Sequence, residues 1–315
     1  MTAAQPSFDT VSLVTLLTIP CILDASMVGR EDRDFMDALI LLAVVQANVA
    51  PLIRDRDLQR AYGGADEPPP DELRRPVSIN AIAHSLRLPY ETTRRRIMRL
   101  AREGACDIGE SGVIVPTREL ASPRHVMALM AIWQQIHALY LRLRDLGLMD
   151  EMIAPADRVR WDAAAGEPPV RAVIRIASDF MLRLIDNTTA QFGGLVAGVI
   201  WFAILRANTE HLSTESRPGL ADDGRRRPVR IAEIAGRLSA PQETVRRYAA
   251  ELAAQDLCER GAKGFVVPAE VLARPESMKI LTENFSDLQR MFSGFAQLGV
   301  LAEWDRQSPP LQGVA

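Results

Sequence analysis

One segment of this chain occurs twice, and the two copies align without a gap. Residues 74–116 match residues 226–268 at an offset of 152 positions, with 20 identities in 43 positions. The identities include both cysteines of the segment, Cys106 with Cys258, and the paired arginines at 94–95 and 246–247. Self-similarity of this extent indicates a duplicated structural unit. The chain is therefore expected to fold as two similar halves.

The repeat extends beyond the 43 residues in weaker form. A Leu-Gly pair at 146–147 returns at 298–299, and an Ala-Asn pair at 47–48 returns at 207–208 if the first half carries eight additional residues within 63–73. Each half then contains about 140 residues. The expected order in each is two apolar helices, a polar linker, the repeated core and one long helix.

Composition supports a mainly α protein divided in this way. The chain has 315 residues, of which 48% are hydrophobic and only 5% aromatic, and its Ala- and Leu-rich stretches favour helix over strand. Four apolar segments, 11–23, 39–45, 173–185 and 195–205, are expected to pack together. The predicted segments are N-terminal helices (1–73), the first core (74–118), a long helix (119–153), a linker (154–169), helices of the second half (170–225), the second core (226–270), a long helix (271–306) and a disordered tail (307–315).

Within each core, the apolar spacing predicts two short helices. In the second copy, apolar residues lie 3, 4 and 7 positions after Ile231, at Ile234, Ala235 and Leu238. This spacing predicts a helix over 232–238, and a tight turn follows at 239–240. Pro241 is expected at the first position of the next helix, where its missing N–H costs nothing. The first copy has Pro89 at the same place. The residues expected on the inward face of the second helix are Thr93, Ile97 and Leu100 in the first copy and Val245, Ala249 and Leu252 in the second.

A hairpin is predicted to follow the two helices. Apolar residues alternate on either side of 261–264, and residues 107–115 repeat the pattern. Cys106 and Cys258 fall on the inward side and are expected to be small core residues rather than redox sensors. Short strands at 77–79 and 229–231 are expected to pair with the hairpins.

Two short helices joined by a three-residue turn and followed by a hairpin form the winged helix-turn-helix arrangement. INAIAHSLRLPYETTRRRIMRLAREGACDI (79–108) and IAEIAGRLSAPQETVRRYAAELAAQDLCER (231–260) resemble the DNA-binding domains of bacterial transcription regulators of the GntR, IclR and MarR kind. The resemblance covers about 43 residues of each half and implies double-stranded DNA as the partner. Those families usually join one such domain to a separate effector or dimerisation domain. Here two copies lie between flanking helices, so the expected architecture is an internal pseudo-dimer, with homodimerisation and a small-molecule effector left open.

Helix geometry turns a polar set of side chains on each second helix outward. In the major groove, Arg pairs with guanine, Gln with adenine, and Glu accepts from cytosine. Residues 74–102 carry eight arginines against one acid, and residues 226–254 carry six against three, although the whole chain has a net charge of −3. Lys263 makes the second hairpin basic, whereas the first is acidic. The candidate DNA-binding residues are Tyr90, Glu91, Thr92, Arg94, Arg95, Arg99, Gln242, Glu243, Thr244, Arg246, Arg247 and Lys263.

Several other kinds of function have little support in the sequence. No nucleophile with a base, phosphate loop or carboxylate pair emerges, so neither catalysis nor a cofactor is expected. The four histidines lack metal-ligand spacing. The apolar run 192–205 is too short to cross a bilayer, and three well-separated cysteines fit a reducing cytoplasm. Core packing is the preferred role for Trp133, Trp201 and Met130, with an effector pocket as the alternative.

The preferred function is sequence-specific DNA binding in transcriptional control, with repression as the default expectation. Two alternatives remain open. The first is a winged helix interaction module whose arginines meet an acidic protein partner. The second is a DNA binder of the replication-initiator kind. Independently of these alternatives, an arginine run on an amphipathic helix can also be an ordinary solvated face.

Overall fold

A computed structural model describes residues 7–28, 34–53, 55–154, 157–159, 168–212 and 223–308. The described chain is mainly helical, with two small antiparallel hairpins. The elements of the first half are α1 (Phe8–Met27), α2 (Phe35–Ile53), α3 (Arg56–Ala61), η1 (Asp71–Leu73), α4 (Ile79–Ser85), α5 (Tyr90–Arg102), β1 (Asp107–Gly109), β2 (Gly112–Ile114), α6 (Thr117–Leu120), α7 (Pro123–Asp145) and α8 (Leu148–Met152). Those of the second half are α9 (Val170–Phe192), α10 (Leu195–Thr209), η4 (Asp223–Arg225), α11 (Ile231–Leu238), α12 (Gln242–Ala254), β3 (Glu259–Gly261), β4 (Gly264–Val266), α13 (Ala269–Ala273), α14 (Pro275–Gln297) and α15 (Val300–Gln307).

The order of elements repeats, which suggests two repeated halves. Helices α1, α2, α4, α5 and α7 have counterparts in α9, α10, α11, α12 and α14, and the hairpins fall at equivalent places. The predicted extra strands are reduced to single antiparallel bridges, Val77 with Val113 and Val229 with Phe265. Helix α3 follows α2 in the first half, just before the region (63–73) where the sequence alignment needed additional residues.

Three predicted boundaries are corrected. The long helix expected over 119–153 is broken, because Gly147 has a φ of 72° and separates α7 from α8; Gly299, with a φ of 77°, breaks its counterpart in the same way. Pro89 and Pro241 are the N-cap residues of α5 and α12 rather than their first residues. The predicted tail begins later than expected, since Gln307 is still helical, and 309–315 lie outside the described residues. Most of the predicted linker lies outside them too.

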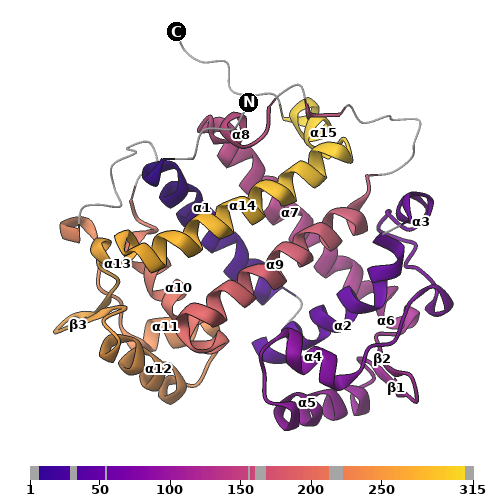
Figure 1. Ribbon diagram of the computed structural model, residues 1–315, viewed down its shortest axis with the longest axis horizontal. Helices are drawn as coiled ribbons and strands as arrows, with labels where there is room; N and C mark the ends of the chain where they lie inside the picture. The colour runs from indigo at the N-terminus through magenta and orange to yellow at the C-terminus, as the bar shows by residue number, and fades with distance from the viewer. Residues whose placement is uncertain are drawn as a thin grey trace.

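The long helices form the centre of the molecule and the two repeated cores lie below them (Figure 1). Helix α1 contacts α14 and α10, and its counterpart α9 contacts α7 and α2. Each helix of the pair therefore packs against the same two elements of the opposite half. The four apolar segments expected to pack together contribute to this interior, as predicted.

Aromatic side chains tie α7 of the first half to the end of the second. Tyr140, Phe292 and Trp304 are almost completely buried, with ring centroids of Tyr140 and Trp304 5.4 Å apart. The Tyr140 hydroxyl donates to Asp305 at 2.8 Å. His137 stacks on the same tryptophan at 4.9 Å. Residues of both halves therefore share this hydrophobic cluster, which includes the second repeated core. The first core packs with α2 in a second cluster that also contains Ile185 of α9 and Leu195 of α10.

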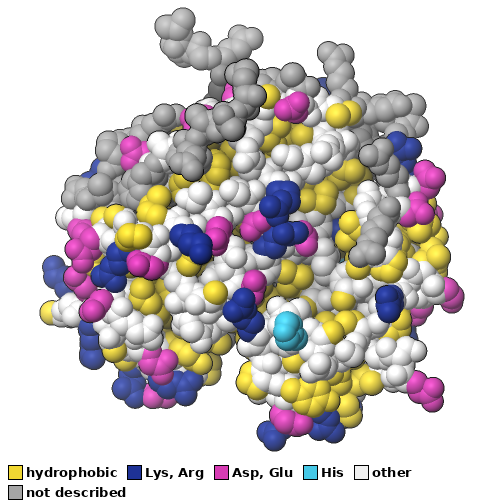
Figure 2. Space-filling model, in the orientation of Figure 1, with side chains coloured by type: hydrophobic (Ala, Val, Ile, Leu, Met, Phe, Trp, Pro, Cys, Tyr) yellow, Lys and Arg dark blue, Asp and Glu magenta, His cyan; other side chains and the backbone are white. Residues whose placement is uncertain are grey.

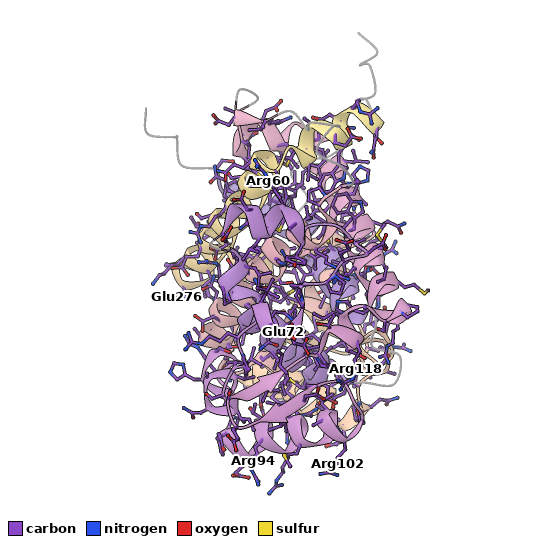
Figure 3. The ribbon with its side chains drawn as sticks, turned by 90° about the vertical axis from the view of Figure 1, so that its right-hand side faces the viewer. Arg60, Glu72, Arg94, Arg102, Arg118 and Glu276 are labelled. Carbon is purple, nitrogen blue, oxygen red and sulfur yellow. The ribbon has the colours of Figure 1, made fainter. Side chains whose placement is uncertain are left out.

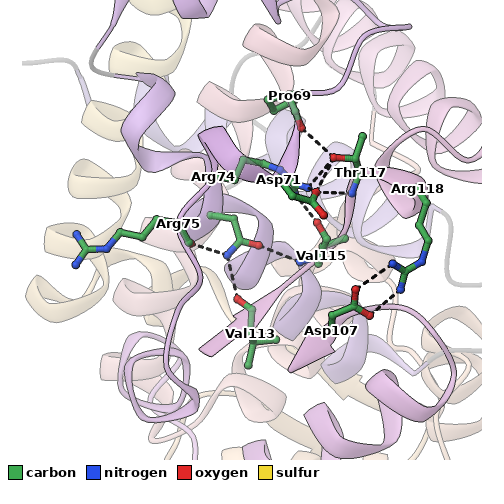
Figure 4. Close-up of polar contacts among 10 residues, drawn as sticks. Pro69, Asp71, Arg74, Arg75, Asp107, Val113, Val115, Thr117 and Arg118 are labelled. Atoms are coloured by element: carbon green, nitrogen blue, oxygen red, sulfur yellow. Dashed lines mark hydrogen bonds and ion pairs between the residues drawn. The ribbon is translucent and has the colours of Figure 1, made fainter. Parts of the chain in front are cut away.

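A buried asparagine joins each core to the helix behind it. Asn48 in α2 donates to the carbonyls of Arg75 (2.9 Å) and Val113 (3.1 Å), and its Oδ1 accepts from the Val115 N–H (3.0 Å). These three partners lie around one point in the first half (Figure 4). Asn208 in α10 repeats all three bonds in the second half, at 2.7, 3.1 and 2.9 Å. Each core is therefore held to its own apolar helix by the same polar contact.

Helix α2 is long and apolar enough, by length and composition alone, to cross a membrane, and α9 with α10 would pass the same test but for a 95° bend. None of these helices was predicted as a membrane span from the sequence, where the apolar run 192–205 was the segment weighed for this role. In this structure α2 packs against α4, α5 and α9, and its Asp37 and Asn48 are engaged in polar contacts with the first core. Its surroundings are those of a core helix.

Candidate nucleic-acid interface

The two helices of each core meet at a turn with the same backbone geometry. Arg87 and Ser239 hold left-handed φ values of 51° and 48°, although neither is glycine. The turn is closed by the Leu88 N–H on the Ala83 carbonyl (2.9 Å) and by the corresponding bond from Ala240 to Ala235 (3.0 Å). Non-glycine residues seldom adopt this conformation. Its recurrence in both halves indicates that the angle between the two helices is a feature of the repeated unit.

The inward face of the second helix is as predicted in both copies. The six residues expected there are buried: Thr93, Ile97, Leu100, Val245, Ala249 and Leu252. Cys106 and Cys258 are buried beside them, and burial raises the pKa of Cys258 to about 11. Since a protonated, buried thiol is a poor nucleophile, this matches the expected core role. With this face fixed, the candidate residues of α5 and α12 can only lie on the outer side or at its edges.

On α5, the N-terminal turns carry most of the exposed candidates. Tyr90, Glu91, Thr92, Arg94 and Arg95 are all exposed, and the tyrosine retains 46% of its accessible surface. Arg94 forms an ion pair with Glu91 at 3.6 Å. Within the described residues, Arg95 has no ion-pair or hydrogen-bond partner. Figure 3 shows Arg94 and Arg102 pointing away from the lower end of the molecule.

Arg99 is placed differently from the other α5 candidates. It pairs with the carboxylate of Asp37 in α2, a side chain only 5% exposed, and lies 3.8 Å from Glu103. Asp37 also accepts from Arg96 at 2.8 Å, and Asp34 accepts from Arg96 at 2.6 Å. Asp37 is not among the candidate residues predicted from the sequence. Two of the α5 arginines thus attach the helix to α2, and Arg99 keeps about half of its surface for another partner.

On α12 the exposed arginines are paired within the helix. Arg246 forms a bidentate pair with Glu243 (2.7 and 3.0 Å), and Arg247 lies 3.9 Å from Glu251. Arg247 also covers the ring of Tyr248, 4.8 Å from its centroid. Gln242 is exposed and Thr244 half-buried. The outer face of α12 is consequently close to neutral, in contrast to that of α5.

The two hairpins differ in charge as expected. Asp107 on the first is paired with Arg118 at 2.6 Å, whereas Arg260 and Lys263 on the second are exposed and, in the part of the chain that the structure describes, have no acidic partner. Arg227 and Arg230, at the start of the second core, are also exposed and have no acidic partner among the described residues. The positive charge of the second core therefore lies on its hairpin and N-terminal edge.

The sequence-based charge count overstated both surfaces, because it included two buried arginines. Arg74 donates to the Val115 carbonyl and to Asp71, which also accepts from Thr117 (Figure 4). Arg226 donates to the Val267 carbonyl and pairs with Asp223 in the second core. Both side chains are fully inaccessible. These arginines close the end of the hairpin and cannot reach an external phosphate.

Helices α5 and α12 lie on the same side of the molecule, at the lower right and lower left of Figure 1. The space-filling view shows this side as two lobes separated by a notch, with basic and acidic side chains at the tip of each (Figure 2). The sequence could not predict this arrangement, because it depends on how the halves pack.

The residues weighed for an effector pocket or a metal site were also located in the structure. Trp133 packs edge-on against Trp304 at 5.1 Å, and the Trp201 indole donates to the Leu257 carbonyl at 2.8 Å, so both follow the core-packing expectation. Met130 is 37% exposed. In the described ranges no three His, Cys, Asp or Glu side chains are grouped to hold a metal ion.

In comparisons with known proteins, no protein-family model, curated protein or solved structure matches the chain.

Proposed function

We propose that the chain is a double-stranded DNA-binding protein of transcriptional control, in which each repeated core is a winged helix-turn-helix domain and the two halves form an internal pseudo-dimer. Helices α5 and α12 would be the recognition helices and the β1–β2 and β3–β4 hairpins the wings. The reciprocal packing of α1 and α9 supports a two-fold relationship between the halves.

The observation that carries the proposal is the position of α5 and α12 on one side of the molecule (Figure 1). Each helix has one face buried in its core, and Arg94, Arg95, Arg246 and Arg247 are exposed. Paired recognition helices on one side are the arrangement that reads two half-sites of a duplex. Tyr90 and Gln242 occupy equivalent positions and differ in chemistry, so the two half-sites are expected to differ in sequence.

The test is selection from a pool of randomised duplexes, with sequencing of the retained DNA. The variant combines Arg94→Ala, Arg95→Ala, Arg246→Ala and Arg247→Ala. Arg60→Ala is the control, because Arg60 is exposed near the opposite end of the molecule (Figure 3). Enrichment of a two-part motif by the wild type and the control, and its loss in the variant, is the expected result.

The opposite result would be equally informative. Equal, unselective retention of wild type and variant at low salt would reject the proposal and favour a winged helix that binds an acidic protein partner. A selected motif that the four substitutions do not weaken would reject the assignment of α5 and α12 as the reading elements.

A further inference from the structure

A cavity of about 290 Å³ lies between α1, α2, α7 and α9, behind the first core. Its wall is mainly apolar and includes Leu41, Leu42, Ile132, Ile136, Phe180 and Met181. An apolar cavity of roughly 150 Å³ suffices to hold benzene. The cavity is therefore large enough for a small organic molecule of roughly a dozen heavy atoms.

The residues that line this cavity can be compared with their counterparts in the second half. The shared contacts of Asn48 and Asn208 place Trp201 and Phe202 of α10 at the positions of Leu41 and Leu42 in α2. In the second half, the Trp201 indole reaches the Leu257 carbonyl at 2.8 Å. The counterpart of Leu257 in the first half is Ala105, which lines the cavity. The first half therefore has smaller residues at both positions, Leu41 for Trp201 and Ala105 for Leu257, and both of them line the cavity.

Two buried arginines from α9 give the cavity a positive wall. Arg171 and Arg175 are 5% and 8% exposed. Among the described residues, their guanidinium groups donate to backbone carbonyls alone: Arg171 donates to Ala65 (3.0 Å) and Leu120 (2.9 Å), and Arg175 donates to Tyr62 (2.7 Å).

One guanidinium nitrogen of Arg175, Nη1, is buried and has no hydrogen-bond partner within the described residues. Burial lowers the pKa of Arg171 and of Arg175 to about 10, so both remain cationic at neutral pH. The other charged residues of the wall are Arg124 and Glu119, which leaves an excess of positive charge. A buried guanidinium without a carboxylate is costly, and an anion that pairs with it would remove that cost.

We propose that this cavity is a binding site for a small apolar carboxylate. The carboxylate would accept from Arg175, and the hydrocarbon body would lie against Leu41, Leu42 and Ile136. The guanidinium group suits this role because it presents parallel N–H donors that match a carboxylate. The apolar wall would select against small hydrated anions.

The proposal is tested by calorimetric titration of the full chain in the absence of DNA, so the result does not depend on the proposed DNA binding. The probes are phenylacetate and hexanoate, each compared with its neutral amide. Binding of at least one carboxylate is expected, with the matching amide weaker by at least about tenfold, because it lacks the charge-assisted pair. The comparison between the two acids tells whether the body is aromatic or aliphatic.

Two variants separate the site from general folding. Arg175→Met removes the anion partner, and Arg183→Met on the exposed face of the same helix is its control. Leu41→Trp fills the cavity with the side chain that the second half carries. Both test variants are expected to lose carboxylate binding by at least about tenfold while keeping the helical circular dichroism spectrum, and the control is expected to bind as the wild type does.

Three outcomes would overturn the proposal: no binding of either carboxylate by the wild type, equal binding of acid and amide, or full binding by Leu41→Trp. If Arg175→Met fails to fold, the Leu41→Trp variant and the amide comparison still decide.

Discussion

Asn48 and Asn208 lie 160 positions apart and make the same three hydrogen bonds to equivalent backbone groups of the two repeated cores. Both side chains are completely buried. Removing the Asn48 amide would take away the partner of the Arg75 carbonyl and of the Val115 N–H, while the Val113 carbonyl would keep its bond from the Val77 N–H. The contact therefore holds each core against its apolar helix.

Replacement of either asparagine by alanine should destabilise the protein by about 2–4 kcal/mol, because unpaired buried polar groups are costly. Urea unfolding followed by circular dichroism measures the change. Asn80→Ala is the control, since Asn80 is exposed on α4. Equal midpoints for Asn48→Ala and the control would show that the contact contributes nothing to stability.

Gly112 and Gly264 should resist substitution for a steric reason. Their φ values are 126° and 139°, and a Cβ on Gly112 would lie 2.6 Å from the Val77 carbonyl oxygen. Gly112→Ala is expected to cost about 1–3 kcal/mol from backbone strain, and to disturb the bridge between Val77 and Val113. Gly109→Ala, with open space around the new methyl, should have a much smaller effect in the same urea experiment. A similar loss in both variants would contradict the steric explanation.

Much of this fold could be predicted because the repeat and its apolar spacing are local signals. The helices and hairpins of each core and the inward positions of Ile97 and Val245 follow from spacings of two to four residues. Long-range contacts left no such signal: Asn48 meets Val113 across 65 positions, and Arg96 meets Asp37 across 59. The Ala-Asn match between the halves was the one available pointer to the first of these. The cavity could not be predicted either, because it depends on how α1, α2, α7 and α9 pack together.

Asp37 is expected to stabilise the fold and to weaken DNA binding. Its carboxylate holds Arg96 and Arg99, and its counterpart in the second half is Ala197. Asp37→Asn should lower stability by about 1–2 kcal/mol, because a buried partner of two half-exposed arginines is neutralised. It should also strengthen binding to random duplex at low salt, since α5 gains net positive charge.

Urea unfolding and fluorescence anisotropy with a random duplex measure the two effects of Asp37→Asn. Asp179→Asn on α9, which removes an exposed carboxylate paired with Arg183, is the control for the change in overall charge. Weaker DNA binding by Asp37→Asn than by this control would mean that the α2–α5 ion pairs position α5 for DNA rather than mask its arginines.

Lys263 offers a clean test of the second wing, because the chain contains only one other lysine, Lys279 in α14. Lys263 is exposed at the β3–β4 turn and has no ion pair among the described residues. A lysine that neutralises one phosphate releases about 0.9 counterion, so Lys263→Ala should lower the magnitude of the slope of log K against log salt concentration by roughly that amount. Lys279→Ala should leave the slope unchanged. Binding isotherms over a series of salt concentrations supply both slopes, and an unaltered slope for Lys263→Ala would remove this wing from the DNA contact while leaving the roles of α5 and α12 intact.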